Sequence, residues 1–176
     1  MLDAFPPTLD AIVVTAAGCG STLKEYGALL ADDPLYASAR QFAEPRAHVS
    51  ELLDAIGATP AHAPARRVAY HDACHLAHAQ GIREAPRRLL AAIPNLELVE
   101  LAEPDVCCGS AGSYNLTQPA MARRLRERKV DHILASGADC VAAGNPGCAL
   151  QIQAGLAARG SAVRVVHPVE LLDGDT

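Results

Sequence analysis

Four cysteines are spaced so that their thiolates can share one metal site. The pattern is Cys74-x32-Cys107-Cys108-Gly109-x38-Cys148. Adjacent cysteines such as Cys107 and Cys108 reach the dihedral angle of a disulfide only with strain, whereas a cluster that contains several iron atoms can take both sulfurs. The spacing therefore predicts an iron–sulfur cluster site rather than a disulfide framework.

Small residues follow the vicinal pair and precede the last cysteine. Gly109 opens a loop of small residues, 109–113, and Gly147 stands directly before Cys148. Glycine lets a backbone bend tightly and brings its N–H groups close to an anionic ligand. In an extended strand, adjacent side chains point to opposite faces, so a turn at Gly109 is needed to bring both thiolates to one site. Gly109 and Gly147 are therefore candidate cofactor-binding residues, and a helix beginning near Ala149 would direct its N–H groups to the cluster.

Polar residues flank Cys74. Asp72 is expected to cap the following turn or to fix its neighbours, because carboxylate is a hard ligand that suits iron–sulfur clusters poorly. His75 and His78 can act as a ligand or a proton donor. Histidines in such positions more often orient a ligand or lie on the surface.

Composition narrows the function classes. The chain has 176 residues, six cysteines, a net charge of −5 and 3% aromatic residues. No basic leader precedes an apolar run, and no apolar stretch approaches the roughly 18 residues of a membrane helix, which predicts a cytoplasmic protein with metal or redox cysteines. The negative charge and the scarcity of aromatic rings argue against nucleic-acid binding. Cys140 is expected in the apolar core, and a solvated helix face is expected for Arg123, Arg124, Arg126, Arg128 and Lys129.

Short apolar runs alternate with segments of helical length. Strands are expected at Ala11–Thr15, Arg67–His71, Leu96–Leu101, Asp139–Ala143 and Val163–Val166. Helices are expected at Ser21–Ala31, Ala47–Ile56, Ile82–Ala92, Pro119–Ala135 and Ala149–Arg159, with a final turn at Val169–Leu172. This alternation predicts an α/β fold in which a parallel sheet carries helices on both faces. Each of the first four strands is followed by cysteine, so the cysteine loops would meet at the carboxyl edge of the sheet.

A faint internal repeat relates the two ends of the chain. Val14-Thr15-Ala16-Ala17-Gly18-Cys19 resembles Ala143-Gly144-Asn145-Pro146-Gly147-Cys148, since each is a strand end, a turn of small residues and Gly-Cys before a helix. The repeat suggests that residues 1–60 are the end of a truncated first unit and that residues 61–176 are a complete second unit. Chance similarity of two short turns is the alternative.

Three stretches carry a resemblance to a known family. They are Tyr70-His71-Asp72-Ala73-Cys74-His75-Leu76, the segment 107–119 that begins Cys-Cys-Gly, and Gly144-Asn145-Pro146-Gly147-Cys148 with Gln151-Ile152. They resemble the cysteine-rich CCG domain of heterodisulfide reductases and, more closely, that of the glycolate oxidase iron–sulfur subunit. The resemblance covers nearly the whole chain and implies one and a half CCG repeats.

The resemblance also implies a site. Cys74, Cys107, Cys108 and Cys148 would be ligands of a second cluster, and Cys19 would match the last ligand of a first one. In heterodisulfide reductases each repeat gathers five cysteines around a non-cubane [4Fe-4S] cluster. Here the terminal Cys-x-x-Cys reads Asn145-Pro146-Gly147-Cys148, which leaves four thiolates. The Cys and CCG elements of the first repeat and the ferredoxin-type Cys-x2-Cys spacing are absent from this sequence.

The function that this resemblance implies is electron transfer through a [4Fe-4S] cluster. A flavin subunit that oxidises glycolate or a related 2-hydroxy acid would be the electron donor, other iron–sulfur segments would be partners, and the acceptor would lie on the quinone side of a membrane. No Gly-x-Gly-x-x-Gly fingerprint is present, so hydride chemistry would belong to the partner. An unpaired sheet edge before Ala11 would favour a homo-oligomer.

Two other functions stay open. The cluster itself could reduce a disulfide substrate, as in heterodisulfide reductases, although the fifth cysteine is missing. Alternatively, the thiolates could hold Zn²⁺ in a structural module. Zinc sites usually use separated cysteine pairs, which makes vicinal cysteines an awkward way to build one tetrahedron.

Overall fold

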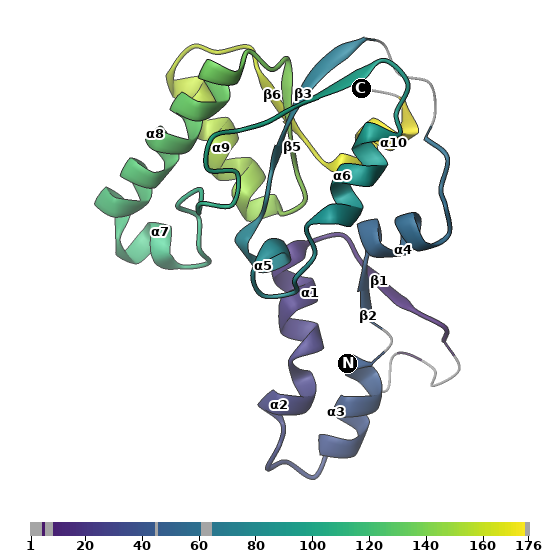
Figure 1. Ribbon diagram of the computed structural model, residues 1–176. Helices are drawn as coiled ribbons and strands as arrows, with labels where there is room; N and C mark the ends of the chain where they lie inside the picture. Colours follow the sequence, from purple (N-terminus) through teal and green to yellow (C-terminus); the bar gives the residue numbers. More distant parts are fainter. Residues whose placement is uncertain (1–4, 6–8, 45, 61–64, 175–176) are drawn as a thin grey trace.

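Two parallel sheets organise the molecule, which is seen here in a computed structural model (Figure 1). The structure describes residues 5, 9–44, 46–60 and 65–174. The larger sheet has the order β4-β3-β5-β6, formed by β3 (Arg66–His71), β4 (Leu96–Val99), β5 (Cys140–Ala143) and β6 (Arg164–Val166). The smaller sheet pairs β1 (Ile12–Val14) with β2 (Arg46–His48). All of these pairings are parallel, as the sequence predicts.

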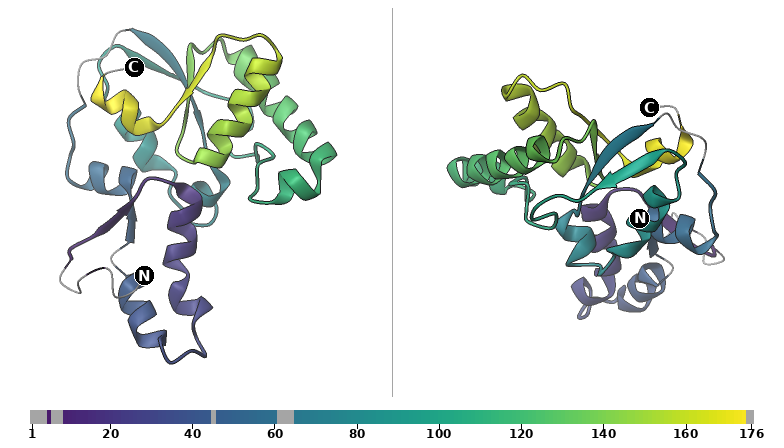
Figure 2. Two further views of the ribbon diagram at one scale, coloured as in Figure 1. Left: turned by 180° about the vertical axis from the view of Figure 1, so that it is seen from behind. Right: turned by 45° about the horizontal axis from the view of Figure 1, so that its top comes forward.

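Helices cover both faces of the larger sheet (Figure 2). On one face α8 (Pro119–Ser136) and α9 (Pro146–Ala158) pack against Ala69 and Val141. On the other face α6 (Glu84–Ala91) and α10 (Pro168–Asp173) pack against alternate strand residues such as Val68 and Tyr70. Because side chains alternate along a strand, two separate hydrophobic clusters form. The predicted α/β fold with helices on both faces is confirmed.

The smaller sheet belongs to a narrower part of the molecule that extends below the larger sheet in Figure 1. Its helices are α1 (Ala17–Lys24), α2 (Tyr26–Leu29), α3 (Tyr36–Ala43) and α4 (Val49–Ala55). Two short helices, α5 (Cys74–Ala77) and α7 (Tyr114–Thr117), complete the fold beside the cysteine segments. None of the helices in the described ranges has the length and apolarity that crossing a bilayer requires.

The internal repeat has a structural counterpart. The unit β1–α1 and the unit β5–α9 each place a cysteine, Cys19 or Cys148, at the third position of the helix. The two turns also touch, because the Ala17 N–H donates to the Gly144 carbonyl at 3.1 Å. This contact brings the equivalent ends of β1 and β5 together. The division into residues 1–60 and 61–176 stays a prediction, and its boundary falls at residues 61–64, outside the described residues.

A second pair of matching segments extends the repeat. His48 precedes α4 and His167 precedes α10, and each histidine is followed at its third position by the run Glu-Leu-Leu-Asp. Each imidazole Nδ1 accepts a hydrogen bond from a backbone N–H of its helix, and each N3 glutamate accepts one from the histidine N–H in return. Burial and the neighbouring His167 lower the pKa of His48 to about 4.

Several expected boundaries are wrong for local reasons. The helix expected at Ala47–Ile56 starts at Val49, because β2 occupies 46–48, and the helix expected at Ser21–Ala31 is divided between α1 and α2. Helix α9 begins at Pro146 rather than Ala149. Proline is favoured in the first turn of a helix, where its missing N–H costs nothing. Cys148 therefore lies inside the first turn of the helix, not in the loop before it.

Candidate metal centre

The four predicted cysteines lie in the segments that follow three adjacent strands, and these segments meet at one edge of the sheet. In the order β4-β3-β5, the chain after β4 carries Cys107 and Cys108, Cys74 is the first residue of α5 after β3, and Cys148 follows β5. The ends of β3 and β5 are in register. Since parallel strands all finish at the same edge, residues that are far apart in the sequence meet there.

The four thiols lie close enough to shift one another's pKa. Hydrogen bonds from Cys108 and Cys74 hold the pKa of Cys107 far below its usual value, and a hydrogen bond from Cys108 lowers the pKa of Cys148 to about 5. The hydrogen bonds made to Cys107, together with burial, raise the pKa of Cys74 and Cys108. The ionisation of each of these sulfurs thus depends on its neighbours. A metal that binds all four sulfurs must displace the remaining protons.

His71 joins this group from the end of β3. It is 0% exposed, and ligand atoms of His71, Cys108 and Cys148 all lie within 4.8 Å of one another. Neither ring nitrogen makes a hydrogen bond of good geometry, although the ring lies beside the Cys148 thiol and lowers its pKa. Buried polar atoms without partners are rare in folded proteins. Three thiol or imidazole donors in a buried pocket, with Cys74 and Cys107 beside them, fit a thiolate-held metal or cluster.

Amide groups donate to two of the four sulfurs. The Gly109 N–H donates to Cys107 Sγ at 3.3 Å, and the Asn145 side-chain amide donates to Cys148 Sγ at 3.5 Å. Such N–H···S contacts stabilise the negative charge of thiolates and tune the potential of a bound cluster. Asn145 stands where a Cys-x-x-Cys motif would have its first thiol, so it supplies a donor there instead of a ligand.

The two candidate glycines allow close packing of the cysteine segments. Gly109 has a φ of +88°, and a Cβ at this position would lie 2.3 Å from the Ala122 carbonyl oxygen of α8. A Cβ at Gly147 would lie 2.8 Å from Ser110 Oγ. The missing side chain at each glycine thus leaves room for an atom of a neighbouring residue. Direct contact between these glycines and a cofactor stays a prediction.

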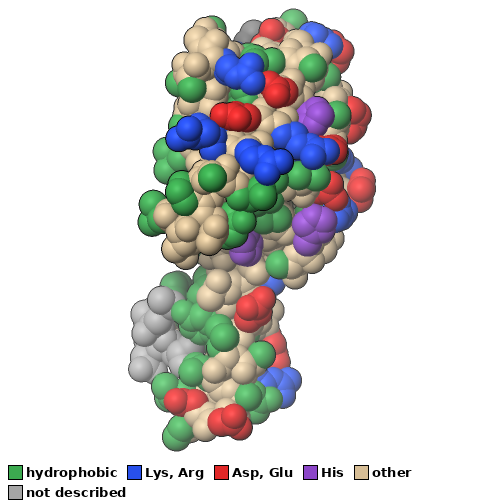
Figure 3. Space-filling view, turned by 90° about the vertical axis from the view of Figure 1, so that its left-hand side faces the viewer, with side chains coloured by type: hydrophobic (Ala, Val, Ile, Leu, Met, Phe, Trp, Pro, Cys, Tyr) green, Lys and Arg blue, Asp and Glu red, His purple; other side chains and the backbone are tan. Residues whose placement is uncertain are grey.

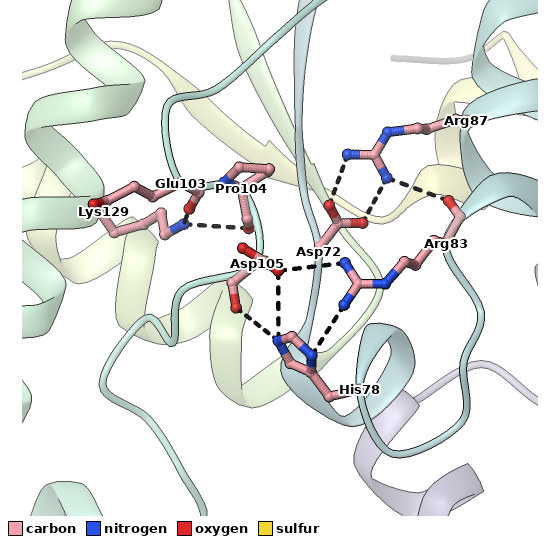
Figure 4. A network of polar contacts seen from close by, with 8 residues as sticks. All are labelled: Asp72, His78, Arg83, Arg87, Glu103, Pro104, Asp105 and Lys129. Carbon is pink, nitrogen blue, oxygen red and sulfur yellow. Dashed lines mark hydrogen bonds and ion pairs between the residues drawn. The ribbon is translucent and has the colours of Figure 1, made fainter.

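Buried charges anchor the segments that carry the cysteines (Figure 4). Lys129 is 1% exposed and its ammonium donates to the carbonyl oxygens of Glu103 and Pro104, just before the vicinal pair. Asp72, at the end of β3, accepts two hydrogen bonds from Arg87 of α6. The Asp72 N–H donates to the Pro104 carbonyl at 3.1 Å, which ties the Cys74 segment to the Cys107 segment.

The solvated helix face predicted for the basic run of α8 is wrong for Lys129. Its side chain lies between α8 and the loop after β4, and burial lowers its pKa while nearby Cys108 opposes that shift. The arginines at 123, 124 and 128 are exposed, as expected. Lys129 is thus buried although it belongs to a basic run, because two backbone carbonyl oxygens accept hydrogen bonds from its ammonium.

An outer polar network covers the Cys74 side of the site. Figure 4 shows Arg83, His78 and Asp105 pointing toward one another from the start of α6, the end of α5 and the loop after β4. Arg83 lies 3.3 Å from the Asp105 carboxylate and 3.0 Å from His78 Nδ1. His75 is exposed, with its Nδ1 3.6 Å from Cys74 Sγ. His78 therefore belongs to a surface network, and His75 remains close to a thiol.

Two cysteines lie apart from this group. Cys140 is buried in β5, within the hydrophobic cluster on the α6 and α10 side of the sheet, as the sequence predicts. Cys19 is exposed on α1, and among the described residues no set of three metal-type ligand atoms includes it. The role of Cys19 as a ligand stays a prediction.

The surface beside the centre carries both charge and apolar side chains. Figure 3 shows Lys and Arg side chains across the upper part of this face, with hydrophobic side chains below them. Leu116 on α7 is 79% exposed and Leu150 on α9 is 74% exposed. Each follows a cysteine segment, the first after Cys108 and the second two residues after Cys148. Exposed large apolar residues in such positions are typical of interaction surfaces.

The parallel α/β fold and the thiols at its carboxyl edge define the class of cysteine-rich α/β domains. A family model described as "Cysteine-rich domain" (CCG) matches residues 68–153, which include all four gathered cysteines. The protein is 32% identical over 171 residues to "Lactate utilization protein A" of Shouchella clausii, with 93% of this chain and 70% of that protein covered. This chain belongs to the cysteine-rich CCG domain family.

Longer relatives match the same residues. The similarity to "Probable glycolate oxidase iron-sulfur subunit" of Bacillus subtilis is 35% identity over 175 residues, covering 93% of this chain and 38% of that protein. The similarity to "Glycolate oxidase iron-sulfur subunit" of Escherichia coli is 34% identity over 181 residues, covering 98% of this chain and 42% of that protein. The chain thus spans about two fifths of the length of these two relatives.

Proposed function

We propose that this chain is an electron-transfer module that holds one [4Fe-4S] cluster on Cys74, Cys107, Cys108 and Cys148. The observation that carries the proposal is the convergence of these four thiols at one edge of the sheet, from segments after three adjacent strands. A bound cluster would supply one-electron chemistry at a potential set by its surroundings. The names of the relatives, which include iron–sulfur subunits, support the same assignment.

The chain's own residues suit a site that must hold negative charge. Backbone and side-chain amides donate to Cys107 and Cys148, and the Lys129 ammonium lies near Cys108. These groups offset the charge of thiolates, and Cys108 and Cys148 lie where water is largely excluded. Cys74 and Cys107 are only partly buried, so electrons would enter or leave on their side.

We propose that the electrons come from a flavin subunit that oxidises glycolate or a related 2-hydroxy acid, with a quinone-side acceptor. The glycolate oxidase names of two relatives support this substrate class. Leu116 and Leu150, exposed beside the centre, offer an apolar contact for such a partner. Residues 1–60 would correspond to the end of a first CCG repeat and residues 61–176 to a second, which the matching β1–α1 and β5–α9 units support.

The test compares two cysteines of the same chain. In protein purified without oxygen, Cys107→Ser should lose most of the iron, the acid-labile sulfide and the brown chromophore. Cys140→Ser is the matched control, because Cys140 is a free thiol of the same chain that lies in the hydrophobic cluster on the other face of the sheet. The proposal fails if Cys107→Ser keeps the wild-type iron and sulfide content.

A zinc site is the second candidate, and one observation favours it. His71, Cys108 and Cys148 are all buried, with ligand atoms within 4.8 Å of one another, which is a donor set that tetrahedral zinc accepts. Metal analysis of protein made without oxygen separates the two functions, since zinc without sulfide would replace the cluster proposal. Disulfide reduction by the cluster stays a prediction, and a change in its EPR spectrum on adding coenzyme M or coenzyme B would support it.

A further inference from the structure

His71 is a deeply buried polar side chain at the centre, without a hydrogen-bond partner of good geometry. It ends β3, and strand alternation puts it on the same face as Ala69, the face that α8 and α9 cover. Its side chain is 0% exposed, and both Nδ1 and Nε2 lack such a partner. Burying imidazole nitrogens unpaired is unfavourable, because they lose the hydrogen bonds that water gives them in the unfolded chain. This free-energy cost is offset if a ligand that binds the folded protein contacts the imidazole ring.

The surroundings of His71 identify the class of that partner. Its ligand atom lies within 4.8 Å of the sulfurs of Cys108 and Cys148, and these sulfurs come from two other segments. Ligands of one tetrahedral metal, at bond lengths of about 2.0–2.3 Å, lie roughly 3.5 Å apart. Movements of about an ångström would therefore let all three atoms bind the same metal centre.

We propose that His71 is a ligand of the cluster and binds one iron through its imidazole beside the thiolates of Cys108 and Cys148. This inference rests on the proposed function. Asn145, three residues before Cys148, provides no thiolate, whereas His71 places a buried ligand-type atom within 4.8 Å of the Cys108 and Cys148 sulfurs. A neutral imidazole adds no negative charge to a buried site that already holds four thiolates. Nitrogen ligation also raises the reduction potential of an iron–sulfur centre relative to all-thiolate ligation.

The nitrogen of His71 provides a direct readout. Protein purified without oxygen, with ¹⁵N-labelled or unlabelled histidine, is brought to a paramagnetic cluster state with dithionite or ferricyanide and measured by pulsed EPR. The wild type should show a strong hyperfine coupling to a histidine nitrogen that changes with the isotope. His71→Ala should abolish it. His75→Ala should keep it, and is the matched control because His75 lies next to Cys74 but on the surface.

A second variant protects the test from a folding defect. His71→Cys offers a thiolate in place of the imidazole, so it should retain the wild-type content of iron and sulfide while losing the histidine coupling. The inference is overturned if the coupling survives in His71→Cys, if it disappears in His75→Ala instead, or if the wild type shows only the weak coupling of a hydrogen-bonded ring. In each of these cases iron and sulfide are present and the proposed function stands. A wild type without iron and sulfide overturns both.

Discussion

Replacing Arg87 by alanine should destabilise the protein by about 3–5 kcal/mol. Asp72 is 2% exposed, and its two carboxylate oxygens accept from Arg87 at 2.6 and 2.7 Å. Without the guanidinium, a buried carboxylate loses its charged partner, and breaking such a pair costs about 3–5 kcal/mol. Arg87 Cζ also lies 5.1 Å from the centre of the Tyr70 ring, so a cation–π contact is lost as well.

The neighbouring arginine provides a matched control. Arg88 also forms two hydrogen bonds to one carboxylate, that of Asp54, but its side chain is 59% exposed. Exposed pairs of this kind contribute about 0–1 kcal/mol, so Arg88→Ala should change stability by no more than that. Urea unfolding at neutral pH measures both variants. A loss for Arg87→Ala that is no greater than the loss for Arg88→Ala would refute the argument from burial.

Three more predictions concern a glycine, a histidine and a lysine. Gly109→Ala should lower the free energy of unfolding by about 2–5 kcal/mol and reduce the metal content, because the added Cβ meets a backbone carbonyl at a positive φ. Gly112 is the control, since it also has a positive φ but faces open space. Gly112→Ala should lower the free energy of unfolding by only about 1–2 kcal/mol in the same assay. The pKa of His48 is about 4 in the folded protein and 6.5 for a free imidazole side chain, so protonation of His48 favours the unfolded chain. The free energy of unfolding should therefore fall by at most about 3 kcal/mol from pH 6.5 to pH 4. His48→Gln should remove this dependence when unfolding is measured against pH. Lys129→Met should shift the reduction potential of the bound cluster to a more negative value in a redox titration, because a buried positive charge near the sulfurs is lost, and the exposed Arg128→Met should not. An unchanged potential in Lys129→Met would show that this charge does not act on the cluster.

The convergence of the cysteines was predictable from the sequence because it depends on topology. Alternation of strands and helices implies a parallel sheet, and a parallel sheet brings the ends of its strands together. Cys74, the vicinal pair and Cys148 each follow a strand that the apolar runs identify, so only the neighbouring order of β4, β3 and β5 was needed in addition. The core position of Cys140 followed from its apolar run in the same way.

Other features depend on single contacts that a sequence pattern does not reveal. His71 ends a strand without any ligand spacing of its own, and its place in the centre follows from which strand face it occupies. Lys129 lies in a basic run, and two carbonyl oxygens contributed by a distant loop make its burial favourable. Strand β2 has three residues, too few for a periodic signal. The repeated His-x-x-Glu-Leu-Leu-Asp segments at α4 and α10, by contrast, are visible in the sequence and indicate both caps.

The central claim is that four thiols hold one iron–sulfur cluster. Its most direct test is the content of iron, acid-labile sulfide and zinc in wild-type protein made and purified without oxygen. The four-thiolate site predicts about four iron and four sulfide per chain, with little zinc. Zinc at about one per chain without sulfide, or a protein free of all three, would contradict the claim.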